Sequence, residues 1–293
     1  MSRAGWIAAL VVVAVIGGGA WWYLDGEGER NADRPATSVT YNRDGDDEGT
    51  TPPEPPDYPL VESPAGTGTD DAGDDPDGDA AAPERTPLPA LGNSDDAVRD
   101  ATGALPGAAP LEARLVPERL IEKFVVTVNS LDGTIAPLSM WPVEDAEGVP
   151  EVDRQGEDRF EWSAANADRY EPYVAAFTTP DAETLAALYV RYYPLLQEAF
   201  ASLGQDEDYF NDRFIAIIDH LLAAPPARER YRLVRPRVLY QFADPGLEAL
   251  SSGQKLMLRL GPEHSQAVRE QLRALRAAIV ARTGNAAGAD SGD

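Results

Sequence analysis

Hydrophobic residues form one unbroken run near the start of the chain and recur at helical spacing in its second half. Residues 5–24 carry no formal charge and end in Trp21, Trp22 and Tyr23. At about 1.5 Å of rise per residue, a helix of this length crosses the roughly 30 Å hydrocarbon core of a bilayer. Aromatic rings favour the boundary between lipid and water, so Trp6 and the three closing aromatic residues suit the two interfaces. The pattern predicts a transmembrane helix.

The predicted anchor, residues 1–24, carries the cation Arg3 and is followed at once by acidic residues. This asymmetry predicts a cytoplasmic N-terminus, with the remainder of the chain outside the cytoplasm. A cleaved secretory signal is the alternative, because Gly18, Gly19 and Ala20 resemble a cleavage site. The apolar character continues beyond that site, which favours the anchor. Both interpretations export the remainder of the chain.

From residue 87 to residue 282 the apolar residues recur mainly at spacings of three and four, which predicts helices. Capping residues, prolines and glycines set the expected bounds. The expected helices are one ending at residue 104 behind a Ser94 cap, 117–131, 166–177, 180–203, 207–223, 253–260 behind a Ser252 cap, and a last helix that begins at Gly261 and Pro262.

Two stretches of this region do not follow the helical spacing. Residues 134–162 place prolines and glycines between short extended pieces near 138–141 and 159–162, which predicts a small β-hairpin. Residues 231–242 mix basic and apolar side chains around a proline and are expected to be extended. The predicted fold class is therefore mainly α: a compact multi-helix domain with a small β-hairpin, behind a transmembrane helix and a linker.

Polar groups fall on the apolar faces of two predicted helices. Tyr192 and Tyr193 share the broad apolar face of helix 180–203. Tyrosines in such a position are usually core residues, and the alternative is a pocket for a sugar or peptide ring. In helix 207–223, Asn211 falls inside the apolar arc. A buried amide needs partners, so we expect Asn211 to bind a neighbouring loop.

Asp212, Asp219 and His220 are the candidates for acid–base chemistry or weak metal binding. The two aspartates lie seven residues apart on one helix face, and the imidazole follows the second. A solvated helix face with a nearby arginine explains the same residues, and the chain lacks the histidine spacing of metal ligands. These three residues are weak catalytic candidates, and neither a cofactor nor a metal site is predicted.

Arginines gather in the extended stretch near residue 235. Arg232, Arg235 and Arg237 belong to this group in a domain that is otherwise acidic. The patch could receive the anionic linker, an anionic glycan or a lipid headgroup. Dispersed ion pairs on the surface are the alternative. The arginines, with Tyr192 and Tyr193, are the candidate partner-binding residues.

The last helix carries a narrow apolar stripe with alternating gaps of four and three. Its members are Val268, Leu272, Leu275 and Ile279. Such a seam suits packing at the edge of the domain or a helix contact between two protomers. A homodimer is therefore one hypothesis.

Composition separates the linker from the domain and excludes some partners. The net charge of −25 argues against nucleic acid, because a phosphate backbone is bound by lysine and arginine clusters. Residues 25–86 are acidic and rich in proline and glycine, so too little apolar surface is available to offset the entropy of ordering. We predict a disordered linker there and a disordered tail at 283–293. Cysteine is absent, so an apolar core rather than disulfides must hold residues 87–282 together.

Several strings in the domain are distinctive in combination. They are PLPAL (87–91), LVPERLI (115–121), YFNDR (209–213), IDHLL (218–222), VLY (238–240), FADP (242–245), SGQK (252–255) and RLGP (259–262). Together they resemble a bacterial envelope family catalogued as domain of unknown function 3014, over about residues 87–280. The resemblance implies an N-terminal membrane segment, a variable linker and one domain in a proteobacterial envelope. It implies no activity, cofactor or catalytic residue.

These observations favour a single-pass inner-membrane protein over an enzyme. The hypothesis is a helical periplasmic domain that binds an envelope protein or glycan, as an adaptor or assembly factor. One alternative is an envelope hydrolase that acts on glycan or peptide with Asp212 and Asp219 as its carboxylate pair. The other is a structural membrane protein that homodimerises.

Overall fold

The computed structural model describes residues 55–60, 87–156, 159–205, 208–236 and 240–283. None of the helices in these ranges has the length and apolar character needed to cross a bilayer. The predicted anchor, with Trp6, Trp21, Trp22 and Tyr23, lies outside the described residues, as do most of the linker and the tail.

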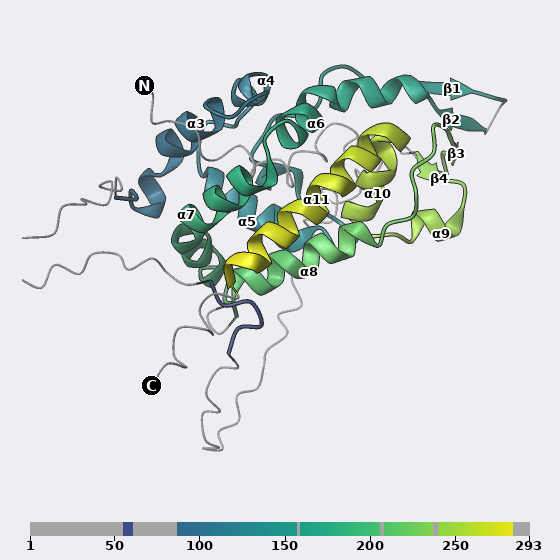
Figure 1. The fold of residues 1–293 in the computed structure, drawn as a ribbon. Coiled ribbons are helices and arrows are strands. Elements are labelled where there is room, and N and C mark those ends of the chain that lie inside the picture. The colour runs from purple at the N-terminus through teal and green to yellow at the C-terminus, as the bar shows by residue number, and fades with distance from the viewer. Residues whose placement is uncertain (1–54, 61–86, 157–158, 206–207, 237–239, 284–293) are drawn as a thin grey trace, which may run out of the picture.

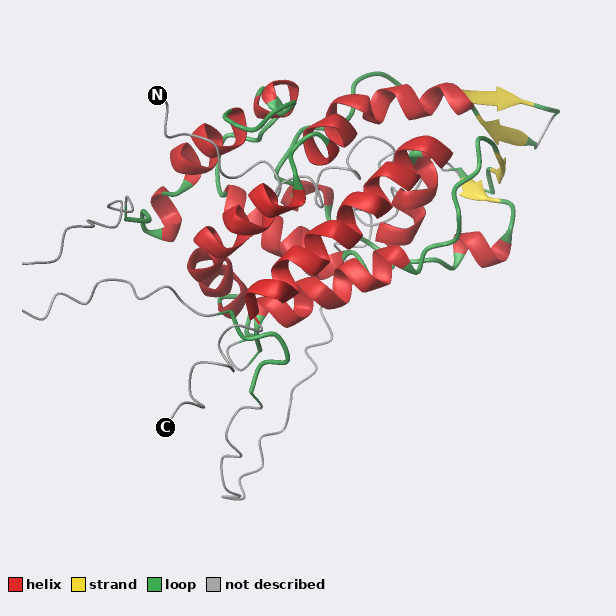
Figure 2. Ribbon diagram, viewed as in Figure 1, coloured by secondary structure: helices red, strands yellow, loops and turns green. Residues whose placement is uncertain are grey.

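The described part of the chain is mostly helical, with one small sheet at its edge (Figure 2). The α-helices are α3 (Asp95–Gly103), α4 (Ala109–Glu112), α5 (Leu120–Ser130), α6 (Glu171–Thr178), α7 (Ala182–Ala201), α8 (Phe210–Leu222), α9 (Pro245–Glu248), α10 (Ser252–Arg259) and α11 (Gly261–Thr283). Short 3-10 helices are η1 (Leu91–Asn93), η2 (Leu138–Met140) and η3 (Ala164–Tyr170). The strands are β1 (Val152–Arg154), β2 (Phe160–Trp162), β3 (Tyr231–Val234) and β4 (Gln241–Phe242).

Helix α11 is the centre of the helical layer. It contacts α6, α7, α8 and α10, and α5 packs on α7 and α8 (Figure 1). The stripe Val268, Leu272, Leu275 and Ile279 is buried in these contacts, with each side chain at most 2% exposed. The stripe is therefore core and offers no surface to a second protomer. The buried face of α11 also includes the polar residues Ser265 and Arg269. Because these residues are polar, the apolar pattern alone made the buried face look like a narrow stripe at the edge of the domain.

The sheet is antiparallel and has the order β1-β2-β3-β4. The predicted extended piece near 159–162 is β2, and the predicted extended stretch 231–242 supplies β3 and β4. The other expected piece, near 138–141, forms η2 instead, because the N–H of Met140 turns back onto the carbonyl of Pro137 at 3.0 Å. The hairpin partner of β2 is β1, so the small hairpin exists and belongs to a larger sheet.

Most helix starts differ from the expected ones by a few residues, and distant groups explain one of them. Helix α5 begins at Leu120 and not at Pro117. Arg119 takes a left-handed backbone conformation with φ of 61°, and the Asp95 carboxylate accepts the N–H groups of Arg119 and Leu120 at 2.9 and 2.8 Å. A carboxylate from α3 thus caps α5, which replaces the local cap that the sequence lacks.

Candidate functional site

A short segment, residues 55–60, packs against helices of the domain that are far from it in the sequence. Figure 1 shows this purple stretch beside the ends of α7, α8 and α11. Side chains in the segment alternate between partly buried and exposed, and the backbone bends at Asp57 and Tyr58. Tyr58 and Leu60 are on the inner side and pack against the core.

Two neighbouring residues at the start of α8 hold the backbone of this segment. The carboxylate of Asp212 accepts the N–H of Asp57 at 3.0 Å and the N–H of Tyr58 at 2.9 Å. The side-chain amide of Asn211 donates to the carbonyl oxygen of Tyr58 at 2.7 Å. The expectation that Asn211 binds a neighbouring loop is confirmed, although the partner comes from 153 residues away. Three main-chain groups at the bend of the segment are therefore recognised at one point.

Arg276 of α11 lies close to the side chain of Tyr58. Its guanidinium group makes a bidentate ion pair with Asp219, at 2.7 and 2.9 Å. The pKa of Arg276 is raised above its ordinary value, first by the hydrogen bond to Asp219 and to a lesser degree by the phenol of Tyr58. Arg276 thus links Tyr58 to α8 and α11, and it remains charged at every physiological pH.

The start of α8 is held rigidly by α7. Gln197 accepts the N–H of Phe210 at 2.8 Å and the hydroxyl of Tyr193 at 3.0 Å, and its own amide donates to the carbonyl of Asp208. Below this cap, the Phe210 ring stacks with Phe214 at a centroid distance of 6.0 Å. Because Gln197 caps the helix, the Asp212 carboxylate is free to bind the segment. Its position in the first turn also suits a negative charge.

The buried amide of Asn211 is only half satisfied by the segment. Asn211 is fully buried, and its Oδ1 atom has no hydrogen-bond partner among the described residues. One acceptor of the site is therefore left unfilled when residues 55–60 occupy it.

Arg213 fastens the other side of α8 to the end of α5. Its guanidinium group donates to Asn129 and makes a bidentate ion pair with Asp132 at 2.8 Å. The hydrogen bond from Arg213 is the largest cause of a lowered pKa at Asp132. The contact positions the helix that carries the site and does not reach the segment itself.

The three candidates for acid–base chemistry enter three separate sets of hydrogen bonds. Asp212 binds the segment, Asp219 binds Arg276, and the Nε2 atom of His220 lies 2.7 Å from the hydroxyl of Ser251. None of these three residues shares a hydrogen bond with another. Within the described residues there is also no group of three or more acidic, histidine or cysteine side chains that could hold a metal ion.

The candidate partner-binding residues are divided between the core and the sheet. Tyr192 and Tyr193 are buried, as the core interpretation predicted, and Tyr193 serves the Gln197 cap. Arg232 is exposed on β3, opposite Glu161 of β2, and the Arg235 guanidinium lies 5.6 Å from the Tyr240 ring centre. Arg237 lies outside the described residues.

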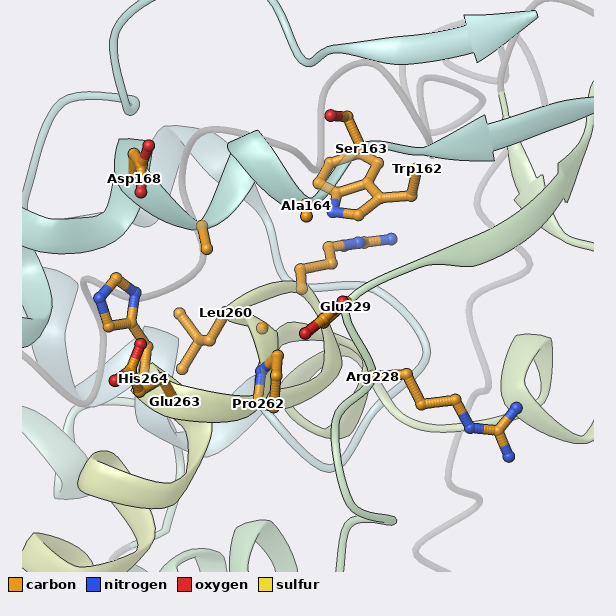
Figure 3. Close-up of a pocket in the computed structure, with 13 residues that line it drawn as sticks. Trp162, Ser163, Ala164, Asp168, Arg228, Glu229, Leu260, Pro262, Glu263 and His264 are labelled. Atoms are coloured by element: carbon orange, nitrogen blue, oxygen red, sulfur yellow. The ribbon is translucent and has the colours of Figure 1, made fainter.

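A hollow of about 230 Å³ lies elsewhere, between β2, η3 and the start of α11 (Figure 3). Its lining includes the carboxylates of Asp168, Glu229 and Glu263. In Figure 3, the guanidinium of Arg228 points away from Asp168 and Glu263. The hollow is smaller than the roughly 300 Å³ at which ligand pockets begin, and its charged groups do not converge. The site at Asn211 and Asp212 is the stronger candidate.

Sequence reasoning missed the segment because it lies inside the predicted disordered linker. The available signal was the alternation of Pro56, Tyr58 and Leu60 with exposed residues in a tract of few apolar side chains. These six residues are placed on the domain because the bonds to α8 and the burial of Tyr58 and Leu60 offset the entropy of ordering them.

Comparison with known proteins identifies the family. A family described as "Protein of unknown function (DUF3014)" matches residues 120–276, more than half of the 293-residue chain. The chain belongs to this family. The matched region contains Asn211, Asp212 and Arg276, and the segment 55–60 lies outside it. Neither a curated protein nor a solved structure matches the chain.

Proposed function

We propose that this member of the DUF3014 family is a single-pass inner-membrane protein whose periplasmic domain is an adaptor that binds a short linear segment of a partner polypeptide. The predicted anchor, linker and envelope resemblance support the location. One observation carries the binding role: Asp212 and Asn211 together hold three main-chain groups of a short segment. Main-chain recognition with apolar side chains as anchors is a recurring way in which domains bind peptides.

The contacts of the carboxylates favour binding over hydrolysis. A general acid or base needs a free position within hydrogen-bond reach of the substrate. Asp212 is engaged by two N–H groups, and Asp219 is engaged by both arms of Arg276. The same contacts that weaken the catalytic hypothesis build a recognition surface.

The proposal is tested by photo-crosslinking the full-length protein in its native cells. Ala216 is exposed on α8, one turn after Asp212, so a photoreactive residue there faces a bound partner segment. A probe at the exposed Arg232 on the sheet is the control. We expect a protein adduct at position 216 that is lost when Asp212→Asn is added and when excess peptide of residues 53–62 competes.

Two results would overturn the binding role. Adducts at 216 that persist in the Asp212→Asn background would show that the recognition site is elsewhere. The absence of any adduct at 216, with adducts at 232, would move the interface to the sheet.

A further inference from the structure

The chain's own residues 55–60 already fill the site that the proposed function assigns to a partner. We infer that this segment is a built-in competitor, so a partner binds only by displacing it. The inference rests on the proposed function, because it concerns the regulation and the ligand chemistry of the same site. It makes the domain autoinhibited by its linker.

The polar part of the contact can be supplied by many peptides. Asp212 binds two consecutive main-chain N–H groups, and Asn211 binds the carbonyl of the second residue. Selectivity must come from the inward side chains, which here are Tyr58 and Leu60. The partner is therefore a peptide that bends at an aromatic residue, as residues 55–60 do at Tyr58, with a leucine two positions later and two free N–H groups ending at the aromatic residue.

The built-in segment is an incomplete ligand, which allows a partner to replace it. Asn211 Oδ1 stays buried without a partner among the described residues. A buried acceptor without a donor disfavours the complex that leaves it so. A partner segment whose side chain donates a hydrogen bond to this oxygen satisfies it, which residues 55–60 do not.

Covalent attachment explains why an incomplete ligand still competes. Residues 61–86 join the segment to the domain, which begins at Pro87. A covalent connection of this length gives a local concentration of order 1 mM. If the free segment binds with a dissociation constant of about 0.1 mM, attachment weakens an added peptide about ten-fold by competition. Moderate affinity is therefore sufficient for autoinhibition.

The experiment uses the full chain in detergent and a fluorescein-labelled peptide of residues 53–62, followed by fluorescence anisotropy. The variant Tyr58→Ala/Leu60→Ala removes both inward anchors from the linker and leaves the domain intact. The matched control is Val39→Ala/Tyr41→Ala, an aliphatic and aromatic pair with the same spacing elsewhere in the linker. We expect the first variant to bind the peptide about ten-fold more tightly than the wild type, and the control to match the wild type.

Adding Asp212→Asn to Tyr58→Ala/Leu60→Ala distinguishes the competition by residues 55–60 from the existence of the peptide-binding site. If the wild type and Tyr58→Ala/Leu60→Ala bind the peptide equally, and Asp212→Asn abolishes this binding, the competition is overturned and the binding site is retained. Absence of binding to every variant overturns both. As a second measurement, excess unlabelled peptide added to isotope-labelled wild-type protein should speed amide exchange at Asp57 and Tyr58. Unchanged exchange during peptide binding would place the peptide at another site and refute the competition.

Discussion

Replacing Asp212 by asparagine should release residues 55–60 from the domain. The carboxylate accepts two main-chain N–H groups at 3.0 and 2.9 Å. A hydrogen bond to a charged group contributes about 1.5 to 3 kcal/mol when buried, and the bond to Asp57 is exposed and therefore weaker. Asparagine keeps one neutral acceptor and turns an NH₂ group toward the other donor. We expect a net loss of about 2 kcal/mol, which is roughly a 30-fold shift toward the released state.

Amide hydrogen exchange measured by NMR on the full chain reports this release directly. The N–H groups of Asp57 and Tyr58 exchange through the released state, so their rates should rise roughly 30-fold in Asp212→Asn. The N–H of Phe214, within α8, should change much less, because the loss of a first-turn charge costs the helix only about 0.5 kcal/mol.

Asp208→Asn is the matched control for the change of charge. Asp208 is exposed beside the same helix end, and its side chain does not bind the segment. If exchange at Asp57 and Tyr58 is unchanged in Asp212→Asn, or rises equally in Asp208→Asn, the proposed recognition of the backbone by Asp212 is refuted.

Three further predictions concern the domain that carries the site, and urea unfolding checks each of them. Arg213→Ala removes four hydrogen bonds between α8 and the end of α5, and should cost about 2 to 3 kcal/mol. Arg213 lowers the pKa of Asp132 in the folded protein, so the ion pair stabilises the fold fully above the pKa that Asp132 has in the unfolded chain. This stabilisation disappears as the pH falls through the pKa of Asp132 in the folded protein. In Arg213→Ala, this part of the acid-induced loss of stability should be missing. Gly253→Ala places a methyl group 2.8 Å from a backbone oxygen of residue 131 and should cost about 1 to 3 kcal/mol, whereas Gly92→Ala enters open space and should cost little. Arg269→Ala leaves three carbonyl oxygens after α8 without their donor and should cost about 2 to 4 kcal/mol.

Each of these predictions has an outcome that contradicts it. An unchanged unfolding midpoint in Arg213→Ala would show that the bridge to α5 carries no net stability. Equal stability of Gly253→Ala and Gly92→Ala would contradict the close approach of α10 to the end of α5. If Arg269→Met is as stable as the wild type, the loss of stability in Arg269→Ala comes from packing and not from the hydrogen bonds to the carbonyl groups.

The periodicity of apolar residues predicted the helices well because burial dictates it. Helices α7 and α8 lie inside the ranges expected from the sequence, and α11 begins at Gly261 as expected and runs one residue into the predicted tail. The stop at Gly261 was visible too, because its φ of 79° needs glycine. Errors concentrated at helix starts, where a distant group supplies the cap, as Asp95 does for α5.

The candidate site was predictable in part. The helical position of Asn211 predicted a buried amide with a partner outside its helix, and this was right. The spacing of Asp212 and Asp219 placed both on one face but could not separate their roles. Residues 55–60 bind Asp212 and Arg276 binds Asp219, and both partners come from other parts of the chain.

The sequence by itself determined which segments are helical, where a predicted membrane helix and an acidic linker precede the domain, and which residues form the apolar faces. These properties follow from local spacing, composition and length. Tertiary structure alone decided that α11 is the central helix, that Asp95 caps α5, and that Tyr58 returns to α8. Such pairings depend on which distant groups meet, because a hydrogen bond forms between neighbours in space, and the sequence spacing of 154 residues between Tyr58 and Asp212 carries no sign of it.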